Sequence, residues 1–177
     1  MSLISLMRLA DHVGASRRQY AWAMLMKARP PLRVEVQLRI LLVVPMPHFT
    51  IQYSANLDSH LDMAEVVEVV RKAAVETGIF PLGGIRVRAI RCEHYAVADG
   101  DPHHGFLDMV LRLGEGRDLL TRQQAGEHIF RVLSDHLDPV FASSSFALSF
   151  DMQINDKQTS WKRNNIHGAL KVKAEHG

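Results

Sequence analysis

Apolar and polar residues alternate in four short segments of the chain, which is the pattern of a β-strand with one buried face. In the first segment Phe49, Ile51 and Tyr53 fall on one side, and Thr50 and Gln52 fall on the other. The same alternation returns three times further along the chain. The pattern predicts strands over residues 48–54, 85–92, 106–113 and 146–154.

Two longer segments carry apolar residues at helical spacing. The first follows Asp62, an N-cap residue with Glu65 three positions later as in a capping box, and it ends at Gly78. The second spans Leu119 to Phe141. Their apolar stripes are formed by Leu61, Val66, Val69, Val70 and Ala73 in the first and by Ala125, Ile129, Val132, Leu133 and Leu137 in the second.

The elements therefore occur in the order strand–helix–strand twice, with starts at Pro47 and Phe106. The two strands of each unit are expected to be parallel, because a crossover helix joins them. Two such units side by side predict an α/β (α+β) fold, a four-stranded mixed sheet with two helices on one face. We expect the other face to remain apolar and uncovered, and an apolar surface of that size favours a homo-oligomer.

The composition fits one globular domain. The chain has 177 residues, of which 47% are apolar and 23% are charged, and this length allows a sizeable core. The single cysteine, Cys92, excludes a disulfide framework and a thiolate metal cluster. The longest apolar run, Ile40 to Pro45, is too short to cross a bilayer, so we expect no membrane partner.

Charge divides the chain into two parts near Met46. Residues 1–45 contain seven Lys or Arg and two acidic residues, a net charge of +5, and the rest of the chain carries −3. Because the basic excess lies in one segment without a folded pattern, it gives no reason to expect a nucleic-acid partner. We expect residues 1–46 to be an N-terminal extension outside the mature protein and residues 47–177 to be the folded domain.

Three interpretations of residues 1–46 stay open. They are an upstream stretch from a start codon placed too early, a genuine tail, or an organelle-targeting segment, for which Arg17, Arg18 and Lys27 are suitable residues. No A-x-A cleavage site follows an apolar core, so we do not expect a secretory signal and predict a cytoplasmic protein.

Met46-Pro47, directly before a strand, has the form of a protein's first two residues. If the working polypeptide begins at Pro47 after loss of Met46, the Pro47 nitrogen is a free secondary amine. An α-amino group has a pKa of about 7.7–8.0, and burial near cations lowers that pKa. Pro47 is therefore the candidate catalytic group, a base that exchanges protons near neutral pH without a metal or a cofactor.

Six strings of residues between Met46 and Lys171 carry a resemblance to a known family. They are Met46-Pro47-His48-Phe49, Thr77 to Arg86, Ala98-Asp99-Gly100, Arg122 to Glu127, Ala147 to Phe150, and Asn164-Asn165-Ile166-His167. In this order they resemble 5-carboxymethyl-2-hydroxymuconate delta-isomerase, a family of the tautomerase superfamily. The resemblance covers nearly all of the chain after the extension.

The resemblance implies a homotrimer of β-α-β-β-α-β subunits and an isomerisation, free of metal and cofactor, in the breakdown of homoprotocatechuate. It implies that Pro47 is the catalytic residue and that Arg86 and Arg117 bind a small-molecule substrate with several carboxylates. Guanidinium groups suit such a substrate because they bind carboxylates in a bidentate manner. The chain departs from the family in the 46 residues that precede the proline.

Two other functions stay open at this point. One is a non-catalytic binding module with the same fold, and the other is a tautomerase that acts on another 2-hydroxydienoate. A metal site is not expected. His103 and His104 lie near Asp99 and Asp101, but their spacing fits no closed zinc site and predicts a polar loop.

Overall fold

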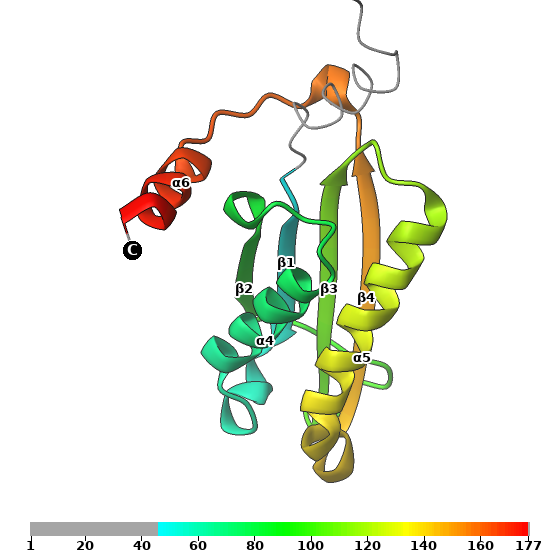
Figure 1. The fold of residues 1–177 in the computed structure, drawn as a ribbon. Coiled ribbons are helices and arrows are strands. Elements are labelled where there is room, and N and C mark those ends of the chain that lie inside the picture. Colours follow the sequence, from blue (N-terminus) through cyan, green and yellow to red (C-terminus); the bar gives the residue numbers. More distant parts are fainter. Residues whose placement is uncertain (1–45, 177) are drawn as a thin grey trace, which may run out of the picture. The chain divides into compact units, whose positions relative to one another are not determined.

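The computed structural model describes residues 46–176. These residues form a four-stranded sheet with two long helices against one face and a third helix near the C-terminus (Figure 1). The predicted extension falls, except for Met46, outside the described residues. None of the helices among residues 46–176 is long and apolar enough to cross a membrane.

The order of elements is the predicted one. The strands are β1 (His48–Ser54), β2 (Arg86–Cys92), β3 (His104–Gly114) and β4 (Ser145–Asn155). The helices are α4 (Met63–Glu76), α5 (Leu119–Ser143) and α6 (Ile166–His176), and the 3-10 turns are η1 (Ala55–Ser59), η2 (Leu82–Gly84) and η3 (Lys157–Thr159). The prediction of the fold is confirmed, and α6 is the one long element that it lacks.

The strands are arranged in the order β2-β1-β3-β4. β1 pairs with β2 and β3 pairs with β4 in parallel, whereas β1 and β3 are antiparallel. Each parallel pair therefore belongs to one strand–helix–strand unit, as predicted. The two units meet along β1 and β3, at the centre of the sheet (Figure 1).

The helix ends follow the sequence signals. The side chain of Asp62 accepts a hydrogen bond from Ala64 N at 2.8 Å, which caps α4. Beyond the other end of α4, Gly78 has a φ of +67°, a conformation that glycine adopts without strain. Asp118 caps α5 in the same way as Asp62 caps α4, by accepting from Thr121 N at 2.7 Å.

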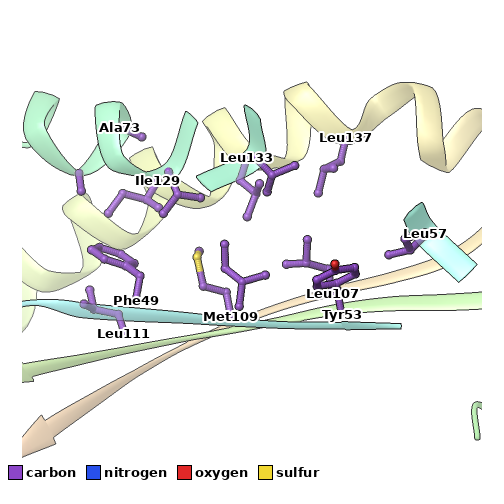
Figure 2. Packing of buried hydrophobic residues seen from close by; sticks show 14 of the residues in the cluster. Phe49, Tyr53, Leu57, Ala73, Leu107, Met109, Leu111, Ile129, Leu133 and Leu137 are labelled. Atoms are coloured by element: carbon purple, nitrogen blue, oxygen red, sulfur yellow. The ribbon is translucent and has the colours of Figure 1, made fainter. Parts of the chain in front are cut away.

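The core lies between the sheet and the two helices α4 and α5 (Figure 2). Phe49 and Ile51 from β1, Leu107 from β3, and Ile129 and Leu133 from α5 are all 0% exposed. Full burial of an apolar side chain of this size contributes roughly 1.5–3 kcal/mol to stability. These contacts fix the start of β1, where Pro47 lies, against the helix layer.

The face of the sheet that turns away from the helices is mostly polar, so the prediction of an apolar open face was wrong. Along each strand the side chains on this face alternate with the buried ones. Alternation therefore places most of the apolar side chains on the helix-covered face. The polar residues on it are His48, Thr50, Gln52, Arg86, Arg88, Asp108, Arg112, Ser149, Asp151 and Gln153. The homo-oligomer stays a prediction, but this face is not an apolar surface that supports it.

Candidate active site

Pro47 is buried directly before β1, beside the glycine turn that leads into β2. Its carbonyl accepts a hydrogen bond from Arg86 N at 3.1 Å. A Cβ at Gly84 would lie 3.3 Å from Pro47 Cδ and 3.4 Å from Met46 Cα. Gly84 is therefore a point of close approach, where a side chain would press on the candidate base.

Arg86 extends from the first position of β2 toward the residue before Pro47. Its Nη1 donates to Gly84 O at 3.0 Å and contacts Met46 Sδ at 3.3 Å. The structure thus brings together two of the three predicted site residues, Pro47 and Arg86. The turn η2 lies close to both, because Gly83 and Gly84 carry no side chain that would hold the neighbouring segments away.

Arg117 follows the turn after β3 and lies half-buried against the segment between α4 and η2. Its Nε and Nη2 donate to Ile79 O at 3.1 and 2.7 Å, and its guanidinium lies 5.1 Å from the centroid of the Phe80 ring. Phe80 in turn packs edge-on against Phe49, with ring centroids 6.1 Å apart. Among residues 46–176, no hydrogen bond joins Arg117 to Pro47 or Arg86.

One nitrogen of the Arg117 guanidinium makes no hydrogen bond among residues 46–176. Nη1 is buried and has no hydrogen-bond partner within the part of the chain that the structure describes. Burial lowers the pKa of the guanidinium, which nevertheless stays charged at neutral pH because the ordinary pKa of arginine is so high. A buried cation with an unused N–H is suited to a carboxylate.

Two arginines flank His48 on the open face at the start of β1. His48 pairs in register with Arg86 on β2 and with Arg112 on β3. Burial lowers the pKa of His48, and the nearby charges of Arg86, Arg112, Arg88 and Lys162 lower it further. His48 is therefore neutral at pH 7, and the end of the sheet next to Pro47 has a positive potential that attracts anions.

The C-terminal segment adds two residues, Asn164 and His167, for which the sequence predicts no role. Asn164 Nδ2 donates to Gly83 O at 2.9 Å and approaches Met46 Sδ at 3.5 Å. His167 packs on the same turn, since a Cβ at Gly83 would lie 2.7 Å from His167 Nδ1. The string Asn164-Asn165-Ile166-His167 was the only signal in the sequence that could have pointed to them.

Two other features lie apart from this site. The loop before β3 holds two separate pairs, His103 Nδ1 with Asp101 at 2.8 Å and His104 Nε2 with Asp99 at 3.0 Å. No three His, Cys, Asp or Glu side chains among the described residues are placed to hold a metal ion together. A groove between α5 and β4, lined by residues such as Leu119, contains none of the three predicted site residues.

The comparisons with known proteins agree on one family. The family model described as 5-carboxymethyl-2-hydroxymuconate isomerase matches residues 47–170. A curated protein of Escherichia coli, 5-carboxymethyl-2-hydroxymuconate Delta-isomerase, is 36% identical over 126 residues, which are 71% of this chain and 100% of that protein.

Two solved structures are also similar to the chain. A 5-carboxymethyl-2-hydroxymuconate isomerase from Deinococcus radiodurans R1 is 34% identical with a TM-score of 0.67, over 72% of this chain and 96% of that one. A structure described as 5-carboxymethyl-2-hydroxymuconate delta-isomerase is 32% identical with a TM-score of 0.69, over 73% of this chain and 96% of that one.

Proposed function

The chain belongs to the 5-carboxymethyl-2-hydroxymuconate isomerase family, and we propose that it moves a double bond in 5-carboxymethyl-2-hydroxymuconate through the free amine of Pro47. The observation that carries this proposal is the position of Pro47, buried next to Arg86 at the cationic end of the sheet. The proposed reaction is a step in the breakdown of homoprotocatechuate and needs no metal and no cofactor.

The Pro47 nitrogen acts as both base and acid in the proposed mechanism. It accepts the proton of the 2-hydroxyl group, whose electrons form the C2 carbonyl while the C2–C3 double bond moves to C3–C4. The electron pair of the C4–C5 double bond then takes the proton from Pro47 at C5. A base that gives and takes a proton works best with a pKa near the working pH.

The free amine is suited to this exchange because of its surroundings. An α-amino group has a pKa of about 7.7–8.0. Burial and the positive charge of Arg86 both disfavour its protonated form and so lower that pKa. We therefore expect Pro47 to be largely neutral at pH 7, ready to take the proton from the substrate.

This chemistry requires that residues 1–46 be absent from the working enzyme. While they are attached, the Pro47 nitrogen is a tertiary amide with neither a basic lone pair nor a proton to exchange. The family match begins at residue 47, and the Escherichia coli relative is matched over its whole length. Both observations support a mature polypeptide that begins at Pro47.

The two arginines bind the carboxylates of the substrate and stabilise the charge that forms on it. Arg86 lies next to Pro47, and Arg117 has a buried, unused N–H. As fixed cations they also stabilise the dienolate that exists after the first proton transfer. Because the arginine forks are held by Gly84 O and Ile79 O, little reorganisation is needed when the substrate binds.

We further propose that the subunit assembles into a homotrimer. β4 lies at one edge of the sheet formed by residues 46–176, and none of these residues pairs with its outer backbone groups. An edge strand of this length favours pairing with another chain. The groove beside it is lined by apolar side chains of Phe130, Leu148, Phe150 and Met152. Sedimentation equilibrium of the purified protein should give the mass of three subunits, and a monomer would contradict the assembly.

The experiment for the function compares two substrates on a chain that begins at Pro47. Turnover of 5-carboxymethyl-2-hydroxymuconate should exceed turnover of phenylenolpyruvate, because the arginines recognise the additional carboxylates; both are followed by absorbance. A preference for phenylenolpyruvate would indicate a tautomerase with another 2-hydroxydienoate as substrate. Turnover of neither, with the fold intact, would indicate a binding module.

A further inference from the structure

The sulfur of Met46 lies where two side-chain donors meet. Arg86 Nη1 is 3.3 Å from Met46 Sδ, and Asn164 Nδ2 is 3.5 Å from the same atom. Met46 itself is buried, with 7% of its surface exposed. Two segments that are far apart in the sequence, the start of β2 and the residues before α6, thus converge on the residue directly before Pro47.

Each of the two donor nitrogens also bonds a glycine carbonyl of the turn η2. Arg86 Nη1 donates to Gly84 O at 3.0 Å, and Asn164 Nδ2 donates to Gly83 O at 2.9 Å. Both nitrogens carry two hydrogens. One hydrogen of each is used by a carbonyl, and the other has only the thioether of Met46, which is a weak acceptor.

The orientation of the Asn164 amide follows from its oxygen. Oδ1 accepts a hydrogen bond at 2.9 Å from the backbone N–H of Ile166, the first residue of α6. Because an oxygen must face that N–H, the NH2 group must face Gly83 O and Met46. The side chain is therefore held at both of its polar atoms before any ligand is present.

We propose that Asn164 is a further substrate-binding residue, whose second N–H joins that of Arg86 on one carboxylate oxygen of the substrate once Met46 is gone. This inference rests on the proposed function, since it requires a polypeptide that begins at Pro47. Removal of Met46 leaves two oriented N–H groups at the place of its sulfur, the side chain of the residue directly before Pro47. An anionic oxygen satisfies them better than the sulfur that it replaces.

The test is equilibrium binding, which does not depend on turnover. The probe is the saturated tricarboxylate with the carbon skeleton of the substrate, titrated by calorimetry into chains that begin at Pro47. Such chains retain the whole core, because the first residue of the hydrophobic cluster is Phe49. Asn164→Ala should weaken the Kd about tenfold or more, as expected for a lost hydrogen bond to a charged group.

The matched control is the neighbouring residue. Asn165 is exposed, and its side chain makes no hydrogen bond within residues 46–176. Asn165→Ala should therefore leave the Kd within about twofold of the wild-type value. Equal losses in the two alanine variants would overturn the proposal, because they would reflect a general change in the C-terminal segment.

A second variant separates substrate binding from capping of α6. Asn164→Asp keeps an oxygen for the Ile166 N–H but has no N–H of its own and places a negative charge near Arg86. The proposal predicts a loss of binding at least as large as that of Asn164→Ala. Binding at the wild-type level by Asn164→Asp would overturn it and leave Asn164 with a role in helix capping alone.

The full 177-residue chain provides a third comparison, because it retains Met46 in the proposed site. It should bind the probe at least about tenfold more weakly than the chain that begins at Pro47, and equal binding would overturn the proposal. Failure of the proposed function looks different. In that case a chain beginning at Pro47 would not turn over the dienol substrate, while probe binding would still depend on Asn164.

Discussion

The two faces of the sheet are built from the same strands but carry different chemistry. On the helix-covered face Phe49, Met109 and Leu111 are 0% exposed and pack in the core (Figure 2). On the open face, in register with each other, lie His48, Arg86 and Arg112. One residue step along a strand therefore separates a position that holds the fold together from a position that presents charge.

The difference explains how the fold holds the site residues in place. Pro47 directly precedes β1 and Arg86 begins β2. Phe49, two residues after Pro47, belongs to the core, and Val87, the residue after Arg86, packs on it. The core thereby fixes the positions of Pro47 and Arg86 through their neighbours in the sequence. Changes on the helix-covered face are expected to lower stability, whereas changes near the cationic end of the open face are expected to lower binding and turnover.

The largest expected effect is the loss of stability in Leu133→Ala, a substitution in α5 on the helix-covered side. Leu133 is fully buried, and removing a buried leucine side chain leaves a cavity that typically costs about 2–5 kcal/mol. Urea unfolding of the chain that begins at Pro47 measures this loss. Gln153→Ala, at an exposed position of the open face, is the control and should change the free energy of unfolding by less than about 0.5 kcal/mol. Equal losses would contradict the distinction between the two faces.

A somewhat smaller effect, on activity, is expected from Arg86→Ala. Loss of a charged contact to the substrate should raise KM or lower kcat by about tenfold or more, which corresponds to roughly 1.5–3 kcal/mol. Steady-state kinetics give the values. The control is Arg88→Ala, which removes an exposed arginine two positions along β2 and should change kcat/KM by less than about threefold. If both variants lost activity equally, a diffuse positive potential would explain the site better than a contact.

The smallest effect concerns the pH dependence of stability. Burial and the neighbouring cations lower the pKa of His48 in the folded protein, while in the unfolded chain it returns to about 6.5. Between these two values the unfolded chain binds more protons, so the free energy of unfolding falls as the pH is lowered through that window. His48→Gln should make this fall shallower, as measured by urea unfolding at several pH values.

The comparison for that measurement is Gln52→Ala, at an exposed position of the same strand that carries no titratable group. It should leave the slope of unfolding free energy against pH as it is in the wild type. A slope that is unchanged in His48→Gln would show that the cations at the start of β1 do not oppose protonation there.

The sequence was sufficient to predict the four strands and the helices α4 and α5, because local signals determine them. Alternation located each strand to within two residues, and Asp62 and Gly78 marked the ends of α4. The charge of the open face could also have been read from the same alternation, since Arg86 and Arg88 stand between apolar neighbours. The prediction of an apolar open face was wrong because it rested on the size of the uncovered face and not on the residues that occupy it.

The rest of the site depends on contacts between distant segments, which no local pattern encodes. Asn164 meets Gly83 across 81 positions of the sequence, and α6 has no buried residue that would give it an apolar stripe. The neighbourhood of Pro47 and Arg86 was predictable because the strands that follow Pro47 and the Gly83-Gly84 turn were expected to pair in parallel, as they do with His48 opposite Arg86. The half-buried setting of Arg117 under Phe80 was not, since it arises from packing between α4, η2 and the turn after β3.

The most direct measurement is the mass of the polypeptide that turns over substrate. Active protein is purified from cells that express the full coding sequence, its N-terminal residue is established by mass spectrometry, and turnover is assayed on the same fractions. The proposed chemistry predicts that activity follows a species whose first residue is Pro47. An active species that still retains Met1 would contradict it, because the Pro47 nitrogen would then be an amide and another group would have to move the proton.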